Sequence, residues 1–302
     1  MMNLIGPSIM CLAGSLTATA NLSLRKNFDY AGTKDAFIFV QSLISFLIAT
    51  CLLNSLSLTN LTPTLLSLGF VSGICYSVLL ISLGKALELG PPALTLAFLN
   101  SSTVVPIPLL MIIFGSAYGF SYTYMNFFGS LLVVLGLFMA TQSSDKQTIS
   151  KKWFFYCGLT FFTHTMFVLI LEWKGLMANS TFGGLSSLVP SSINPNHAQW
   201  FVVVQFLTVA IVQGVRLIQS NIRIKPSDIA LGSYGGIANG LSLYYMIYAL
   251  TNTPEAQHAM IVPLFSVTIV VICNIWGYLL YKEKINIPAN TLCLIGIFIG
   301  SA

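Results

Sequence analysis

The chain has 302 residues, of which 56% are hydrophobic and only 7% are charged. Because a soluble domain carries about 25% charged residues, this chain cannot cover a water-facing surface and needs lipid around most of its outside. The formal net charge of +5 does not indicate nucleic-acid binding, since the Lys and Arg residues lie in or beside the connections between apolar runs.

A run of about 20 apolar residues can cross a hydrocarbon core about 30 Å thick, and ten such runs follow one another along the chain. Backbone in lipid must satisfy its own hydrogen bonds, so these runs are predicted to be helices. The predicted spans are 4–24, 36–54, 64–86, 92–114, 119–141, 153–172, 198–219, 227–250, 257–281 and 286–301. We therefore expect an all-α integral membrane protein with ten transmembrane helices, multi-pass in the cell (inner) membrane and without a soluble catalytic domain.

Two segments of the chain, 64–93 and 227–256, align without a gap and indicate an internal repeat. The alignment pairs Gly69 with Gly232, Gly73 with Gly236, Ala86-Leu87 with Ala249-Leu250, and Pro91 with Pro254. The polar segment 142–152 separates the spans five and five, so we predict two repeats, 1–146 and 147–302, within one membrane domain. Two five-span copies in one chain must have opposite orientations, and such inverted repeats are the architecture of many secondary transporters.

Short motifs near the span ends carry a family resemblance. The second half contains Tyr248-Ala249-Leu250, Ala256, Pro263, Lys282-Glu283 and Gly296, and the first half contains Lys85-Ala86-Leu87, Pro91 and Gly136. In these residues the chain resembles the drug/metabolite transporter superfamily, in its ten-span EamA-like branch, and the resemblance covers essentially the whole chain. It implies two inverted five-helix repeats that transport a small molecule.

The first half departs from the family pattern in two places. The run Phe114-Gly115-Ser116-Ala117 stands where the family has an acidic residue after the fourth span. Pro106 and Pro108 also sit deeper in their span than Pro263 does in its own. The resemblance therefore bears on the fold more than on the substrate.

Polar side chains inside a span are unfavourable in lipid, and they usually face a neighbouring helix or a water-filled cavity. Span 92–114 carries Asn100-Ser101-Ser102-Thr103, followed by Pro106 and Pro108, which free carbonyl groups from the helical ladder. A broken, polar helix at mid-depth is typical of a transporter site, whereas a single Ser or Thr more often bonds to a neighbouring helix. We predict that Asn100, Ser101 and Thr103 contact the substrate.

Three other spans carry polar residues at mid-depth. His164 makes either a structural hydrogen bond or a substrate contact. Asn239, Ser242 and Tyr245 recur every three residues and form a slanting stripe that faces either a cavity or a neighbouring helix. Tyr76 is the repeat counterpart of Asn239, so both are predicted to face one cavity from opposite repeats. The complete predicted substrate-binding set is Tyr76, Asn100, Ser101, Thr103, His164, Asn239, Ser242 and Tyr245.

The charged residues are expected at the ends of the spans. Every Asp and Glu lies in a connection or within about a turn of a span end, so no carboxylate is expected at mid-depth to relay a proton. We therefore expect exchange or facilitated diffusion, with His164 as the one titrating group, while His258 is expected at a solvated helix end. Of the 13 Lys and Arg residues, all but Lys174, in the expected loop 173–197, fall on one side of the predicted topology, which places both termini outside.

The sequence thus predicts a secondary transporter that moves a small neutral, zwitterionic or cationic metabolite, such as an amino acid or an amino-acid-derived cofactor, by alternating access. Tyrosine faces and amides suit an ammonium or sulfonium group and a planar ring. The alternative is a non-transporting membrane scaffold or lipid-handling protein, whose polar stripes would close onto one another; a membrane enzyme is more remote. The sequence lacks a phosphate-cradling Gly-rich loop, an HExxH motif and paired intramembrane aspartates, so no catalytic residue, metal or cofactor is predicted. The expected partners are the metabolite and membrane lipid but no nucleic acid, with the chain a monomer or a homodimer.

Overall fold

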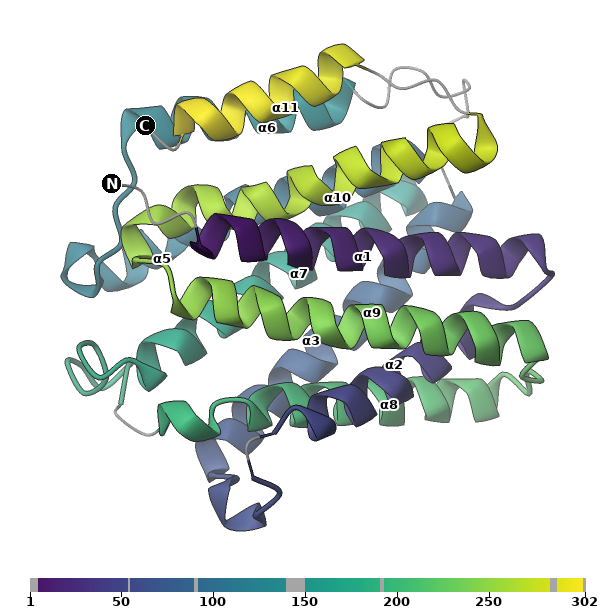
Figure 1. Ribbon diagram of the computed structural model, residues 1–302, viewed down its shortest axis with the longest axis horizontal. Coiled ribbons are helices and arrows are strands. Elements are labelled where there is room, and N and C mark those ends of the chain that lie inside the picture. Colours follow the sequence, from purple (N-terminus) through teal and green to yellow (C-terminus); the bar gives the residue numbers. More distant parts are fainter. Residues whose placement is uncertain are drawn as a thin grey trace. The chain divides into compact units, whose positions relative to one another are not determined.

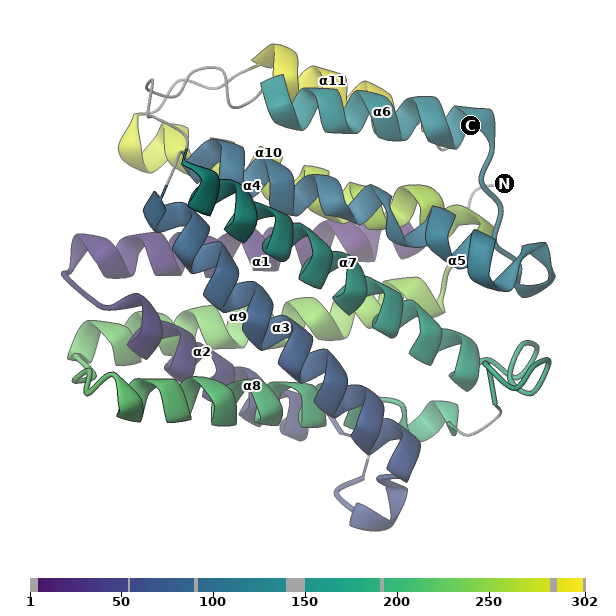
Figure 2. The ribbon, with the colours of Figure 1, turned by 180° about the vertical axis from the view of Figure 1, so that it is seen from behind.

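The computed structural model describes residues 5–53, 55–89, 92–139, 150–190, 193–282 and 287–300. Within these ranges nearly all regular structure is helical, apart from an isolated bridge between Ser186 and Val189 (Figures 1 and 2). The predicted all-α class is confirmed. Pro91 and the expected boundary between the repeats at 146/147 lie outside the described residues.

The helices follow the apolar runs of the sequence. They are α1 (Ile5–Asp29), α2 (Lys34–Cys51), α3 (Pro63–Leu89), α4 (Pro92–Ser101), α5 (Pro106–Phe114), α6 (Tyr124–Met139), α7 (Lys151–Ala178), α8 (Trp200–Gln219), α9 (Pro226–Thr251), α10 (His258–Tyr281) and α11 (Ile287–Gly300). Short 3-10 turns, η1 to η5, lie at Leu58–Asn60, Ser102–Val104, Ser116–Tyr118, Pro195–His197 and Glu255–Gln257.

Five helical segments of the described chain are long and apolar enough to cross a membrane: Lys34–Cys51, Pro63–Leu89, Lys151–Ala178, Pro195–Gln219 and Glu255–Tyr281. Shorter apolar helical stretches are Phe98–Phe114, Tyr124–Met139 and Ile287–Gly300. Large apolar side chains such as Ile112 and Phe298 lie exposed on these helices. This surface is consistent with a multi-pass membrane protein.

The chain forms two compact units, and each unit draws on both halves of the sequence. The first unit comprises Met1–Ala18, Val78–Leu169 and Tyr248–Ala302, and the second comprises Thr19–Ser77 and Ile170–Ile247. Helices α1, α3, α7 and α9 contribute residues to both units. The elements of each unit are described separately below.

Glycines of α3 bring this helix close to α8 within the second unit. A methyl group at Gly69 would lie 3.0 Å from the carbonyl oxygen of Phe201, and one at Gly73 would lie 2.8 Å from that of Gln205. Small residues at such positions let two helix backbones approach closely.

Glycines of α9 approach α2 in the same manner within the second unit. A methyl group at Gly232 would lie 3.2 Å from the carbonyl oxygen of Phe37, and one at Gly236 would lie 2.7 Å from that of Gln41. Gly232 and Gly236 are the residues that the sequence repeat pairs with the two glycines of α3.

Helices α6 and α11 of the first unit lie side by side in both views (Figures 1 and 2). A methyl group at Gly129 would lie 2.5 Å from the carbonyl oxygen of Gly296, and one at Gly296 would lie 2.6 Å from that of Gly129. Asn126 adds a buried hydrogen bond from its Nδ2 to the carbonyl oxygen of Gly300, at 2.6 Å. The contact between the two glycines is therefore reciprocal.

The predicted start of the long loop at residue 173 is wrong. Helix α7 continues to Ala178 because Leu176 and Met177 are buried and extend its packing face by more than a turn. Lys174 is consequently a buried helical residue whose Nζ lies 5.5 Å from the centre of the Phe201 ring.

The carboxylates of Glu172 and Asp228 are buried, and Glu172 lies deeper in its helix than the sequence indicated. Glu172 is buried inside α7, rather than near its end, because α7 is longer than the predicted span. Asp228 in the first turn of α9 is fully buried and accepts hydrogen bonds from Asn27 Nδ2, Thr33 N and Lys225 N at 2.7, 2.8 and 2.9 Å. Asp228 therefore ties the connection between α1 and α2 to the start of α9.

His258 is also buried, so the predicted solvated position is wrong. Its Nε2 lies 3.2 Å from the carbonyl oxygen of Leu250 and 3.1 Å from that of Thr253. Leu250 lies in the last turn of α9, whose carbonyl groups lack donors within the helix, and Thr253 follows that helix by two residues. His258 therefore caps α9 from the start of α10.

Candidate functional site

The eight predicted substrate-binding residues fall into two groups, one in each compact unit. The first unit holds Asn100, Ser101, Thr103 and His164, and the second holds Tyr76, Asn239, Ser242 and Tyr245. The common cavity bordered by both groups stays a prediction. The geometry inside each group is well defined.

The group in the first unit is built around a break in the helical chain. Helix α4 ends at Ser101, residues Ser102–Val104 form the 3-10 turn η2, and α5 begins at Pro106. Prolines lack an amide hydrogen, so Pro106 and Pro108 cannot donate to carbonyl groups in the preceding turn. The break predicted from these two prolines is confirmed.

The polar side chains before the break are buried and bond to their own helix. Asn100 Nδ2 donates to the carbonyl oxygen of Leu96 at 2.8 Å. Ser101 Oγ donates to that of Phe98 at 2.9 Å. Thr103 Oγ1 donates to that of Asn100 at 2.7 Å. Such local bonds occupy the two hydroxyl donors and one N–H of Asn100, while the hydroxyl oxygens retain lone pairs that can accept.

His164 joins this break through Ser102, a residue outside the predicted set. Its Nδ1 lies 2.5 Å from Ser102 Oγ, and its ring stacks on Phe167 at 6.2 Å between centroids. Two hydroxyl oxygens elsewhere in the first unit, Thr165 Oγ1 on α7 and Ser266 Oγ on α10, are buried without a hydrogen-bond partner in the described chain. Ser102 lies in the polar run Asn100-Ser101-Ser102-Thr103 of the sequence. Its contact with His164 depends on how α7 is rotated relative to α4, so the sequence alone does not show it.

The group in the second unit forms a hydrogen-bonded chain across three helices. Tyr76 Oη on α3 donates to Asn239 Oδ1 on α9 at 3.4 Å. Asn239 Nδ2 lies 3.4 Å from Ser45 Oγ on α2, which donates to the carbonyl oxygen of Gly236 at 2.9 Å. The ring of Tyr76 also meets Phe206 of α8 edge-on, at 6.4 Å. The predicted pair Tyr76 and Asn239 is thus brought into direct contact.

The other residues of the predicted stripe continue along α9. Ser242 is buried, and Tyr245 is half-buried with its ring edge-on to that of Tyr244 at 5.6 Å. One turn before Tyr76 on α3, Ser72 Oγ donates to Gln205 Oε1 of α8 at 3.1 Å. Ser72 and Gln205 are fully buried and were missed in the sequence; the spacing of Ser72 from Tyr76 was the available signal, because residues four apart share a helix face.

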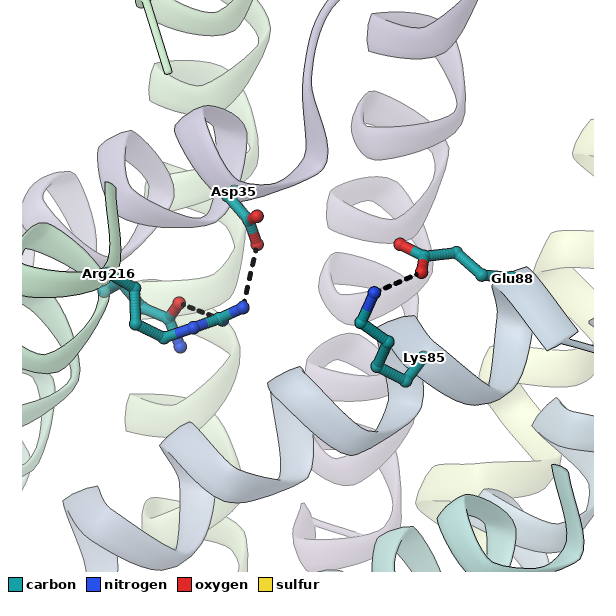
Figure 3. A network of polar contacts seen from close by, with 5 residues as sticks. Asp35, Lys85, Glu88 and Arg216 are labelled. Atoms are coloured by element: carbon teal, nitrogen blue, oxygen red, sulfur yellow. Dashed lines mark hydrogen bonds and ion pairs between the residues drawn. The ribbon is translucent and has the colours of Figure 1, made fainter. Parts of the chain in front are cut away.

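Charged side chains pair with one another near helix ends, apart from these two groups (Figure 3). Arg216 of α8 lies 3.5 Å from Asp35 of α2 and donates to Gln213 Oε1 at 3.1 Å. Lys85 and Glu88 form a separate 2.8 Å ion pair on α3. Such partly exposed pairs contribute little to stability, about 1 kcal/mol at most.

A cavity of about 310 Å³ lies in the first unit, apart from the predicted residues. It is lined by Pro7, Ser121, Thr123, Asn126, Ala256, Gln257, Met260, Ile261, Leu264, Ile297 and Gly300. Its lining is mostly apolar, and it contains no member of the predicted substrate-binding set.

Comparison with known proteins supports the fold alone. No family model matches the chain, and no curated protein matches it. The chain is similar to a solved structure described only as "Crystal structure of protein", with a TM-score of 0.70, 14% sequence identity, and coverage of 98% of this chain and 95% of that chain. The similarity therefore extends over the complete helical architecture.

Proposed function

We propose that this protein is a secondary transporter of the drug/metabolite transporter superfamily, in its ten-span EamA-like branch. It moves a small neutral, zwitterionic or cationic metabolite across the cell (inner) membrane by alternating access. The observation that carries the proposal is the helix break at Ser102–Val104, which lies among buried polar side chains in an otherwise apolar chain. Interrupted helices of this kind form the substrate sites of many secondary transporters.

Two reciprocal sets of contacts support the inverted repeats. Gly69 and Gly73 approach carbonyls four residues apart on α8, and their repeat counterparts Gly232 and Gly236 approach carbonyls four residues apart on α2. If a two-fold axis relates the halves, a contact away from the axis occurs twice, once in each half. A contact on the axis occurs once and joins two equivalent residues, as in an isologous interface. The hydrogen bond between Tyr76 and Asn239 fits this relation, since the alignment pairs these two residues. In this scheme α4, η2 and α5 together make one of ten spans.

The reciprocal contact between Gly129 and Gly296 supports the same relation in the first unit. The proposed two-fold axis exchanges α6 with α11, and this exchange leaves the contact between the two glycines unchanged. These helices are the fifth and tenth spans of the proposed topology, which occupy equivalent positions in two five-span repeats.

The chemistry of the two groups favours a substrate that is neutral, zwitterionic or cationic. The predicted residues offer hydroxyls, carboxamides, an imidazole and phenol rings, and none of them carries a fixed positive charge. A phosphorylated substrate would be expected to meet Arg or Lys. Aromatic faces and carboxamide oxygens instead suit an ammonium group.

Uptake by purified protein in proteoliposomes tests the proposal. A panel of labelled amino acids, simple amines and nucleosides is offered to vesicles with and without protein, and at least one compound should enter in a saturable, protein-dependent manner. Failure of every compound to enter would favour the alternative of a membrane scaffold or lipid-handling protein.

The matched control for site variants is Asn274→Ala. Asn274 Nδ2 donates to Asn290 Oδ1 at 2.9 Å between α10 and α11. This is another hydrogen bond that a side-chain amide makes between helices, and neither residue belongs to the proposed site. Asn274→Ala therefore removes a bond of the same kind and should leave the substrate's KM unchanged.

A further inference from the structure

Two very short contacts share one serine hydroxyl at the helix break. Ser102 Oγ lies 2.5 Å from His164 Nδ1 and 2.5 Å from the carbonyl oxygen of Leu99. Two lone pairs that face each other at this distance repel, so a proton must lie in each of the two contacts. Leu99 O, Ser102 Oγ and His164 Nδ1 therefore share two protons.

The supply of protons decides the tautomer of the imidazole. A carbonyl oxygen carries no proton, and a hydroxyl carries one. Ser102 donates its proton to Leu99, so the proton in the other contact belongs to His164 Nδ1.

A neutral imidazole with its proton on Nδ1 has a lone pair on Nε2. Within the described ranges no protein group donates a hydrogen bond to this nitrogen. The ring is half-buried and is held from two sides, by Ser102 at Nδ1 and by the face of Phe167. His164 thus presents a fixed hydrogen-bond acceptor in the middle of a long apolar helix.

We propose that His164 Nε2 accepts a hydrogen bond from an N–H group of the transported molecule, and that Ser102 is the positioning residue that fixes the tautomer. The proposal rests on the proposed transport function and narrows its substrate class. A primary ammonium or an amide offers the required donor, whereas a quaternary ammonium or a sulfonium offers none. Among the ammonium and amide compounds that the proposed site suits, the substrate is therefore one with at least one N–H group.

Two substitutions separate an acceptor role from a structural role. In His164→Gln the carboxamide reaches the place of Nε2, while in His164→Asn it reaches the place of Nδ1 and keeps the bond to Ser102. At pH 8 the wild-type ring is neutral, since the ordinary imidazole pKa is about 6.5. Proteoliposome uptake of labelled amino acids and of labelled ethanolamine, each offered separately, provides the measurement.

If Nε2 accepts from the substrate, His164→Gln retains kcat/KM within a few-fold of wild type, whereas His164→Asn loses about 10- to 100-fold, as expected for a lost hydrogen bond to a charged group. The opposite ranking, with Asn active and Gln inactive, would mean that the ring serves only to hold Ser102. Ser102→Ala should raise KM several-fold by releasing the tautomer, and Ser102→Thr should restore it. Equal uptake of methylamine and tetramethylammonium by wild type would also overturn the proposal, because tetramethylammonium has no N–H group and no other hydrogen-bond donor.

A spectroscopic readout separates this inference from the transport function. The chain has three histidines, so 15N-histidine NMR of wild type and of His164→Asn assigns the His164 signals by difference. The proton should reside on Nδ1, and a proton on Nε2 would refute the tautomer whether or not the protein transports. Absence of any uptake by wild type would instead overturn the transport function and, with it, the substrate contact at Nε2.

Discussion

The phenol of Tyr76 donates to the carboxamide oxygen of Asn239 at 3.4 Å across 163 positions of the chain. This separation is the offset at which 64–93 aligns with 227–256, so the contact joins two residues that the alignment pairs. If the two halves are inverted repeats, as we propose, a residue and its counterpart can meet in this way only on or near the axis that relates them. The contact gives the proposed substrate site a defined central pair.

Replacement of Asn239 should impair transport more than stability. Asn239→Ala removes the acceptor of Tyr76 and a contact with Ser45, and interhelical hydrogen bonds in membranes contribute about 0.6 to 2 kcal/mol each. We expect kcat/KM to fall at least about ten-fold if Asn239 contacts the substrate, since such a contact contributes a further 1 to 3 kcal/mol. Asn274→Ala should lose similar stability while transport stays near wild type, and equal transport by both variants would remove Asn239 from the site.

Glycine substitutions should test the reciprocal packing. A methyl group at Gly73 or Gly236 would lie within 2.8 Å of a carbonyl oxygen, so Gly73→Ala and Gly236→Ala should each destabilise the protein by about 1 to 3 kcal/mol. Gly158→Ala on α7 is the control, because no atom lies within 4 Å of the added methyl group. Thermal unfolding in detergent measures the effect. Unequal losses at Gly73 and Gly236 would argue against equivalent environments.

Asp228 should be the carboxylate that matters most for stability. Its two oxygens accept three hydrogen bonds at full burial, and loss of a buried acceptor costs about 1 to 3 kcal/mol. Asp228→Asn should therefore lower the unfolding temperature by several degrees. Glu88→Gln, which weakens an exposed ion pair with Lys85, should change it little. The two variants would unfold alike if the Asp228 contacts were unimportant.

Coupling can be assigned to a small number of groups. Exchange or facilitated diffusion is expected, so an imposed proton gradient should not drive accumulation of the substrate. Accumulation that survives His164→Ala would contradict a coupling role for that residue. The burial of Glu172 inside α7 makes Glu172→Gln the second variant to measure, since a carboxylate buried inside a helix can also carry a proton.

The orientation follows from the distribution of Lys and Arg, which are retained on the cytoplasmic side. Ser187 in the long connection and Ser150 before α7 are both exposed, so single cysteines there can be labelled on a background lacking the native cysteines. Ser187→Cys should react from outside and Ser150→Cys from inside. Labelling in the reverse sense would place both termini in the cytoplasm.

Hydropathy predicts the helices well because lipid leaves the backbone few alternatives. It places the end of α7 six residues early, because residues 173–178 mix Lys174 and Gly175 with apolar residues and read as a connection. Hydropathy also does not predict the burial of His258, because its partners are backbone carbonyl groups at and just after the end of α9. Carbonyl partners have no signature in the sequence.

Part of the candidate site can likewise be predicted from the sequence, and part cannot. The alignment of 64–93 with 227–256 singles out Tyr76 and Asn239 as a pair expected to face one cavity, but it does not predict their direct hydrogen bond. The bonds of Asn100, Ser101 and Thr103 to their own helix depend on side-chain rotamers, which residue type does not determine. The contact of Ser102 with His164 depends on how α7 is rotated against α4, so the sequence could indicate the polar run but not its partner.

Counterflow in proteoliposomes tests the transporter assignment most directly. Vesicles loaded with a high concentration of an unlabelled substrate from the uptake panel are diluted into a trace of the same labelled compound, with no pH gradient or membrane potential. An alternating-access carrier should concentrate the label transiently above its outside level, and Asn239→Ala should abolish this overshoot while Asn274→Ala retains it. Entry of the label only to equilibrium, at a rate that the internal substrate does not change, would contradict a carrier mechanism.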